Sequence, residues 1–174
     1  EYIRSAPGLT GYAKCGGNYA ASIRSGEFAQ EIGYDQVLWL DGVYHEYVEE
    51  VGSLNIFFKI DGKIFTAPCL GTVLPGVTRR SVITLLKELG YAVFEEKLSI
   101  DDVMRAGKEG RLEEVFGTGT AAVISPVGVL RKNDTTIVIN HGEIGKISKI
   151  MYDTLTDIQW GRTSKHTEWT RSIE

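Results

Sequence analysis

The sequence Ser53-Leu54-Asn55-Ile56-Phe57-Phe58-Lys59-Ile60-Asp61-Gly62-Lys63-Ile64-Phe65-Thr66 carries the strongest hairpin signal in this chain. Two runs rich in β-branched and aromatic residues, 53–60 and 63–66, flank the dipeptide Asp61-Gly62. Asp-Gly is favoured in tight hairpin turns because these residues accept the positive φ that such turns require. We therefore predict two antiparallel strands joined at this dipeptide.

Outward from the hairpin, apolar periodicity predicts a mixture of helices and short strands. The expected helices cover residues 18–32, with Asn18 as N-cap, 77–89 after Pro75-Gly76, and 99–106 with Ser99 as cap. A last helix carries Ile147, Ile150, Met151, Leu155 and Ile158 on one face and stops near Gly161. The other expected strands are 2–5, 37–40, 91–95, 114–116, 121–124, 129–131 and 136–139. This order predicts an α/β or α+β domain built on a curved sheet, not a doubly wound parallel sheet.

The composition is that of an ordinary globular chain of 174 residues, with 43% hydrophobic and 24% charged residues. This length suits one domain. A net charge of −4 argues against nucleic acid or an anionic membrane as the main partner, since either favours a basic surface. Cys15 and Cys69 do not form a metal-ligand spacing. Because the chain begins at Glu1, within an apparent strand, we expect that an upstream part of the protein is missing.

One lysine lies among glycines in the segment 11–22, GYAKCGGNYAAS, just before the first predicted helix. A lysine forms a covalent bond with a carbonyl compound only if it is held in place and partly dehydrated. Glycines let a ligand approach the backbone closely. Lys14 is therefore the candidate catalytic residue, and the alternative is a solvated lysine in a loop.

A pair of carboxylates, Glu49 and Glu50, leads directly into the first strand of the predicted hairpin. A carboxylate at the mouth of an apolar strand is poorly solvated and needs a cationic partner. The alternative is that both residues complete a solvated turn.

Two further segments could bind anions through backbone N–H groups. The turn 71–80, GTVLPGVTRR, places Val77 and Thr78 at the start of a helix, where free N–H groups attract phosphate. The bend 116–122, FGTGTAA, could form a nest for phosphate or carboxylate. The alternatives are an ordinary Pro-Gly turn and a glycine-rich bend between strands.

Together these segments resemble the C-terminal large domain of branched-chain amino-acid aminotransferases, in the fold-type-IV group of pyridoxal-phosphate enzymes. The matching landmarks are KCGGNY at 14–19, EVGSLNIF at 50–57, LPGVTR at 74–79 and FGTGTA at 116–121. They occur in the family's order, from about residue 2 to Trp169. The resemblance implies a curved pseudo-barrel sheet with flanking helices. It assigns 1–174 to the large cofactor-binding domain, without the family's small N-terminal domain.

The resemblance also implies a role for each matching residue. Lys14 would bind pyridoxal 5′-phosphate covalently and move a proton between the substrate Cα and the cofactor, while Glu50 would contact the pyridine nitrogen and Tyr19 the 3′ oxygen. The remaining positions are Gly76, Val77, Thr78 and Thr120 for the phosphate, and Ser53, Thr120 and Ala121 for the substrate.

The implied reaction is a ping-pong exchange of an amino group between leucine, isoleucine or valine and 2-oxoglutarate. The family further implies a cytoplasmic homodimer acting in branched-chain amino-acid biosynthesis or in the reverse direction. Its small N-terminal domain contributes an arginine to the phosphate and aromatic groups to the substrate pocket. We therefore expect these 174 residues alone to bind the cofactor weakly. Ala122 and Ser125 replace a Cys-x-x-Cys pair of some members, so no thiol switch is expected there.

Two other interpretations stay open from the sequence. D-amino-acid aminotransferases and aminodeoxychorismate lyases are also fold-type-IV enzymes with the lysine, the glutamate and the phosphate site. The motifs at 14–19 and 74–79 favour the branched-chain group. The second alternative is a truncated domain that binds the cofactor or another anion without catalysis.

Overall fold

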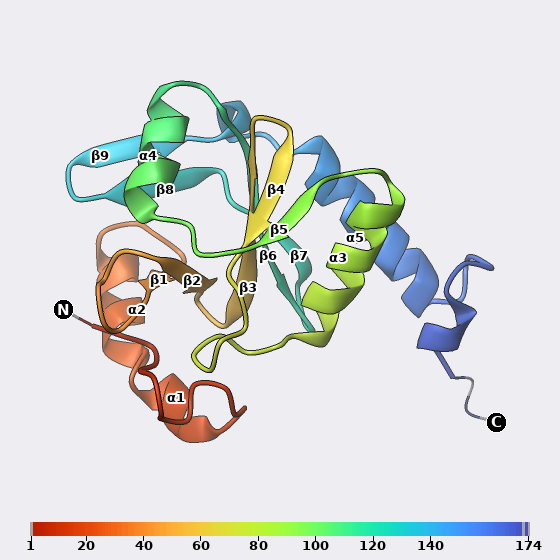
Figure 1. Cartoon of the computed structure of the whole chain (residues 1–174), viewed down its shortest axis with the longest axis horizontal. Coiled ribbons are helices and arrows are strands. Elements are labelled where there is room, and N and C mark those ends of the chain that lie inside the picture. Colours follow the sequence, from red (N-terminus) through yellow and green to blue (C-terminus); the bar gives the residue numbers. More distant parts are fainter. Residues whose placement is uncertain (1, 172, 174) are drawn as a thin grey trace.

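The computed structural model describes residues 2–171 and 173, and these form a mixed α/β fold (Figure 1). Glu1, Ser172 and Glu174, at the ends of the expected domain 1–174, lie outside the described residues. The helices are α1 (Gly16–Ala20), α2 (Ile23–Glu31), α3 (Val77–Glu88), α4 (Ile100–Lys108) and α5 (Lys146–Gln159), with 3-10 turns η1 (Asn140–Gly142) and η2 (Thr167–Trp169). The strands are β1 (Leu38–Leu40), β2 (Val48–Val51), β3 (Leu54–Ile60), β4 (Lys63–Thr66), β5 (Val93–Glu95), β6 (Leu112–Gly119), β7 (Val123–Pro126), β8 (Val129–Lys132) and β9 (Thr135–Val138).

Strand β3 is the centre of the main sheet. One edge pairs antiparallel with β6, and the opposite edge pairs first with β2 and then with β4. The predicted hairpin is confirmed: Asp61 and Gly62, with φ of 49° and 74°, join β3 to β4. The seven strands follow the order β1-β2-β3-β4-β5, with β6 and β7 added beside β3, and β8 and β9 form a separate pair.

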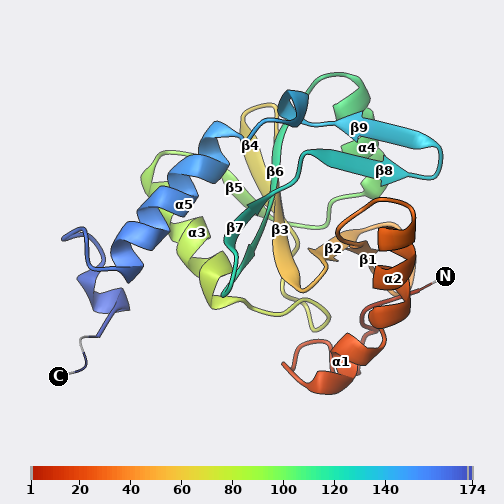
Figure 2. The same cartoon turned by 180° about the vertical axis from the view of Figure 1, so that it is seen from behind.

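Both faces of β3 are buried, and each faces its own apolar cluster. Ile56 and Phe58 pack toward α4 and the β8–β9 hairpin. Phe57 packs toward α3 and α5 and stacks on Phe116 of β6, with ring centroids 5.2 Å apart. Figure 2 shows α3 and α5 together on one side of the sheet and α4 with β8–β9 on the other. The predicted mixed α/β class with flanking helices is confirmed, and the described strands form an open sheet, not a closed barrel.

Glu114 connects the sheet to the last helix. It lies in β6, is buried, and accepts hydrogen bonds from the backbone N–H groups of Ile147 and Ser148 at 3.0 and 3.1 Å. The first N–H groups of a helix have no partner within the helix, so this carboxylate satisfies two of them. The predicted apolar face of α5 is thereby fixed against β6 and β7.

The strand predicted over residues 2–5 is not formed. Arg4 is buried there, and its guanidinium donates to the backbone carbonyl groups of Thr72 and Gly11. The segment is therefore held by a side chain and not by a ladder of backbone hydrogen bonds.

Conversely, β2 was not predicted as a strand, because its two glutamates interrupt the apolar pattern.

The single helix predicted over 18–32 is two helices, α1 and α2, which meet at Ala21-Ser22. Asn18 is not an N-cap: it lies inside α1, and its side-chain amide donates to carbonyl groups of the preceding loop. The predicted apolar face of α2 does not meet the core either. Phe28 is 59% exposed and Ile23 60% exposed, while Ala29 is buried.

The other predicted elements occur with shifted ends. Ser99 caps α4 as expected, accepting from the backbone N–H of Asp101 at 3.2 Å. Strand β6 is longer than predicted because its small and hydroxyl residues continue the ladder beside β3. None of the helices among the described residues is both long and apolar enough to cross a membrane.

Candidate functional site

The four motif segments meet at one end of the main sheet. In the register of β3 and β6, Asn55 lies opposite Thr118, so the beginning of β3 is beside the end of β6. Asn55 also donates through Nδ2 to the carbonyl oxygen of Leu74 at 2.9 Å, which brings the loop before α3 to the same place. Figure 1 shows α1 and the first turn of α3 at this end.

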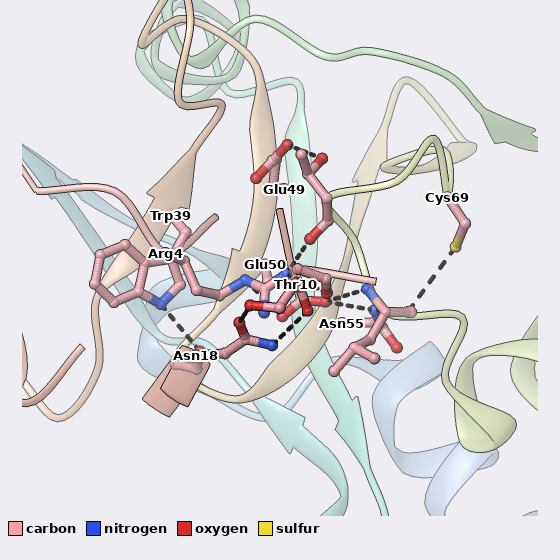
Figure 3. Close-up of polar contacts among 12 residues, drawn as sticks. Arg4, Thr10, Asn18, Trp39, Glu49, Glu50, Asn55 and Cys69 are labelled. Atoms are coloured by element: carbon pink, nitrogen blue, oxygen red, sulfur yellow. Dashed lines mark hydrogen bonds and ion pairs between the residues drawn. The ribbon is translucent and has the colours of Figure 1, made fainter. Parts of the chain in front are cut away.

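Glu50 is the most enclosed charged side chain at this end, at 2% exposed. Its Oε2 lies 3.1 Å from Arg4 Nε, and its Oε1 accepts from Leu74 N at 2.9 Å and from Asn55 Nδ2 at 3.3 Å. Figure 3 shows Arg4, Glu50 and Asn55 pointing toward one another. The two hydrogen-bond donors and the Arg4 ion pair come from three different segments, so the position of Glu50 is fixed from several sides.

Burial raises the pKa of Glu50 to about 7. The Arg4 guanidinium, the Leu74 N–H and the charge of Lys14 act in the opposite direction, and the neighbouring Glu49 raises the pKa further. A carboxyl group with such a pKa is poised to change its charge near neutral pH, which is common at functional sites.

Glu49 is also buried, so the alternative of a solvated turn at 49–50 is wrong. It accepts a hydrogen bond from the Thr72 hydroxyl group, and burial raises the pKa of its carboxyl group. Successive strand residues point to opposite faces, so only one of the two carboxylates can face Asn55 and Leu74. In β2 that residue is Glu50.

The lysine loop is closed by Asn18. Its Nδ2 donates to the carbonyl oxygens of Thr10 and Ala13 at 2.8 and 2.7 Å, and its Oδ1 accepts from the Thr10 hydroxyl group at 2.7 Å. Lys14 lies in this loop with an exposed side chain, and its positive charge is a minor effect that opposes the rise in the pKa of Glu50. Tyr19 is half-buried in α1, one residue after Asn18.

The start of α3 offers free backbone donors. Gly76 is its N-cap and has no side chain to accept from the first turn, where Val77 is exposed and Thr78 half-buried. A Cβ atom on Gly76 would lie 2.2 Å from Asn55 Oδ1, so a larger residue there requires the Asn55 amide to shift. The free N–H groups and the dipole at the start of this 12-residue helix favour the binding of an anion.

The turn between β6 and β7 presents Thr120 and Ala121, and both are exposed. Val123, which follows the turn, has a φ of 55°. This left-handed conformation is unusual for a β-branched residue and is found where a turn has a required shape. The turn belongs to the same end of the sheet as Glu50, because β6 ends there.

Ser53 lies apart from the carboxylate network, in the exposed turn between β2 and β3. It helps to line a cavity of about 170 Å³ beside α2, together with Ser22, Gly26, Gln36, Val37, Trp39 and Gly52. The structure therefore groups Lys14, Glu50, the start of α3 and the β6–β7 turn at one end, with Ser53 at its margin.

Two polar residues of this end were missed from the sequence. The sequence predicts a strand at Arg4, and it indicates no separate role for Asn55 within the motif at 50–57. The available signal was that Glu50 needed a cation, since a buried carboxylate requires a partner. Nothing in the spacing of the sequence indicates that this cation is 46 positions upstream, at Arg4.

A buried carboxylate, a loop that carries an exposed lysine and the start of a helix thus lie together at one end of the open sheet. The family model for amino-transferase class IV matches residues 3–130. The chain belongs to this family.

The chain is similar in sequence to curated branched-chain-amino-acid aminotransferases. It is 54% identical over 173 residues to branched-chain-amino-acid aminotransferase 2 of Bacillus subtilis (strain 168), covering 99% of this chain and 48% of the relative. It is 51% identical over 173 residues to branched-chain-amino-acid transaminase 1 of the same organism, covering 99% of this chain and 49% of that relative. The chain thus spans about half the length of the curated relatives it matches.

Solved structures of similar proteins share the fold. The branched-chain amino acid aminotransferase of Escherichia coli superposes with a TM-score of 0.83 at 34% identity, covering all of this chain and 54% of that one. The T.th. branched-chain amino acid aminotransferase, complexed with N-(5′-phosphopyridoxyl)-L-glutamate, superposes with a TM-score of 0.84 at 31% identity, covering all of this chain and 54% of that one.

Proposed function

We propose that this chain is the cofactor-binding domain of a branched-chain amino-acid aminotransferase. The reaction would exchange an amino group between leucine, isoleucine or valine and 2-oxoglutarate, with pyridoxal phosphate as cofactor. The observation that carries the proposal is Glu50, a buried carboxylate that lies within the electrostatic reach of Lys14 and is hydrogen-bonded to the loop that begins the anion site. The relatives at 51–54% identity support the branched-chain substrate class.

The residues of the chain fit pyridoxal phosphate. When bound, this cofactor supplies an electron-withdrawing ring that stabilises negative charge on the substrate Cα. Glu50 would keep the ring nitrogen protonated, because a carboxylate beside a pyridinium favours its charged form. Tyr19 would donate to the 3′ oxygen and hold the plane of the ring.

Lys14 would provide the covalent attachment and then carry the proton at the substrate Cα. A lysine acts as a base only as a neutral amine. Proton transfer also requires its Nζ to lie close to the reacting carbon, so the loop must hold the side chain there. Asn18 performs this holding, because its amide ties together two carbonyl groups that precede Lys14. A Cβ on Gly16 or Gly17 would meet open space, so this side of the loop is open to a ligand.

Two separate anion sites would bind the cofactor phosphate and the substrate carboxylate. The N–H groups of Val77 and Thr78, after Gly76 and with the Thr120 hydroxyl group, would bind the phosphate. The N–H groups of Thr120 and Ala121 would bind the substrate carboxylate, and Ser53 would contact the substrate side chain. The exposure of Thr120 and Ala121 leaves these donors free to be reached.

The domain assignment is part of the same proposal. Residues 1–174 would be the large C-terminal domain of a protein that also has a small N-terminal domain and acts as a cytoplasmic homodimer in branched-chain amino-acid biosynthesis. The coverage of about half of each relative supports it. So do the exposed apolar side chains Ile23, Phe28 and Ile32 in and just after α2, which offer a surface for another domain or subunit.

A substrate comparison tests the function. The full-length protein, supplied with pyridoxal phosphate and an oxo-acid acceptor, should use L-leucine in preference to D-alanine, and should not convert aminodeoxychorismate. Preference for D-alanine would assign the chain to the D-amino-acid aminotransferases. Release of pyruvate from aminodeoxychorismate would assign it to the lyases.

A further inference from the structure

One buried cation joins the three segments that build the candidate site. The Arg4 guanidinium contacts Glu50 on β2 through Nε, and through Nη2 it donates to the carbonyl oxygens of Thr72, in the loop before α3, and of Gly11, in the lysine loop. Its side chain is 4% exposed. No other buried side chain among the described residues bonds all three segments.

The two hydrogen-bond donors to Glu50 are neutral, and Arg4 contacts it as an ion pair. Leu74 N and Asn55 Nδ2 both donate to Oε1, whereas Oε2 has the Arg4 ion pair. The titratable groups whose charges act on Glu50 are Arg4, Glu49 and Lys14, and Glu50 in turn acts on Cys69. Lys14 is exposed, so Arg4 is the buried positive charge at this carboxylate. A carboxyl group buried without a cation is held mainly as the neutral acid.

We propose that Arg4 is a positioning residue that keeps Glu50 as an oriented carboxylate at this end of the sheet. Its guanidinium fixes one carboxylate oxygen, and its two carbonyl contacts fix the guanidinium in turn. The consequence for pyridoxal phosphate rests on the proposed function. The ionisation of Glu50 does not, so it can be measured in the chain without cofactor.

The test is a ¹³C NMR titration of the Glu50 side-chain carboxyl carbon in the cofactor-free chain, with the signal assigned by its loss in Glu50→Gln. Arg4→Met removes the charge. It should lower the carboxylate-to-acid ratio of Glu50 at pH 7 about tenfold or more, because an opposite charge at this distance shifts such equilibria by that order. Arg4→Lys keeps a charge without the planar fork and should restore most of the wild-type ratio.

Arg79→Met is the matched control. Arg79 is also a buried arginine that bonds a backbone carbonyl, that of Ala67, and a carboxylate, that of Glu95, but it does not contact Glu50. Its replacement should leave the Glu50 ratio unchanged. If Arg4→Met also leaves the ratio unchanged, or if Arg79→Met lowers it equally, the positioning role is refuted. Should Arg4→Met not fold, Arg4→Gln is titrated with the same criteria, since its amide can still bond a carbonyl group.

The outcome separates this inference from the proposed function. A change in Glu50 ionisation together with no attachment of pyridoxal phosphate to Lys14 supports the role of Arg4 and rejects the function. Attachment to Lys14 with no change in Glu50 ionisation supports the function and rejects the role of Arg4.

Discussion

Glu50 combines a burial that opposes charge with contacts that favour it. Burial raises the pKa of its carboxyl group, and the Arg4 guanidinium and the Leu74 N–H oppose that effect. The net result is a group that ionises near pH 7, where a small change in its surroundings decides its charge. A single residue thereby links the packing of β2 to the chemistry proposed for the site.

Glu50→Ala should separate cofactor attachment from catalysis. Because Glu50 would act at the ring nitrogen and not at Lys14, we expect the variant of the full-length protein to bind pyridoxal phosphate covalently. Its amino transfer from L-leucine should fall on the order of 100-fold or more, as for the loss of a preorganised electrostatic contact. Steady-state kinetics with the absorbance of the bound cofactor measures both. Unaltered amino transfer would show that the ring nitrogen has another partner.

Asn18→Ala should loosen the lysine loop. The variant removes the two part-buried hydrogen bonds to the carbonyl groups of Thr10 and Ala13, and a bond of this kind contributes about 0.5–1.5 kcal/mol to stability. Urea unfolding measures the loss, and amide hydrogen exchange of the loop locates it. Gln30→Ala, on the exposed side of α2, is the control and should change stability by less than about 0.5 kcal/mol. Equal losses in the two variants would contradict the holding role of Asn18.

At the scale of elements, the local signals in the sequence were reliable where one residue decides a turn. The Asp61-Gly62 hairpin and the helix after Pro75-Gly76 were both predicted, because positive φ and the missing N–H of proline act within a few residues. Strand β2 was not predicted. Its glutamates are buried only because Arg4 and Thr72, distant in sequence, supply their partners.

For α2, the prediction of a buried apolar face was wrong. Its apolar spacing predicted a core face, yet Ile23 and Phe28 are exposed in this chain. Periodicity reports that a face is apolar and not which surface covers it. Motifs predict the candidate site residues, whereas the contacts of Arg4 and Asn55 required the tertiary structure, since both join segments that are distant in sequence.

The start of α3 gives a test at the scale of one element. Gly76→Ala places a Cβ 2.2 Å from Asn55 Oδ1, so Asn55 must move away from Leu74 and Glu50. We expect the free energy of unfolding to fall by about 1–3 kcal/mol. The binding of inorganic phosphate or pyridoxal phosphate, measured by titration calorimetry, should also become weaker.

Gly26→Ala is the matched control for this variant. Gly26 is a helical glycine whose Cβ would meet open space. Its replacement should leave stability unchanged or raise it by up to about 1 kcal/mol, because alanine favours the helix. A tolerated Gly76→Ala with unchanged anion binding would contradict the close approach of Asn55 to this helix.

The segment after α5 is held to α3 by a histidine. His166 Nε2 lies 3.0 Å from Glu88 on α3, Nδ1 lies 3.2 Å from Glu168, and the ring stacks on Trp169. The hydrogen bonds to Glu88 and Glu168 raise the pKa of His166. A raised histidine pKa means that the contact stabilises the fold fully below the unfolded-state pKa of about 6.5 and is lost as pH rises through the folded-state value.

The rate of proteolysis measures how firmly this contact holds the segment after α5. Tryptic cleavage after Arg162 and Lys165 should be slow at about pH 6 and faster toward about pH 8.5, after correction for the pH dependence of trypsin on a peptide substrate. His166→Asn keeps a residue that tolerates the φ of 53° found here but cannot gain a charge, so its cleavage should lose this dependence. The same pH dependence in the variant would show that another group controls the segment.

For the whole molecule, the site is assembled from segments that start at Arg4 and end at Ala121, held at one end of an open sheet by the packing on both of its faces. The chain covers about half of each curated relative, and the proposed small N-terminal domain would complete the site. The residue on which the proposed chemistry depends, Lys14, is nevertheless on this chain, so its role can be tested without the rest of the protein.

The direct measurement is borohydride reduction of the chain after incubation with a high concentration of pyridoxal phosphate, followed by digestion and mass spectrometry. We predict that the phosphopyridoxyl group is found on Lys14, ahead of the exposed lysines Lys63, Lys87 and Lys149, and that Lys14→Ala removes this labelling. Labelling spread evenly over the exposed lysines, with no preference for Lys14, would contradict the proposed role of this residue.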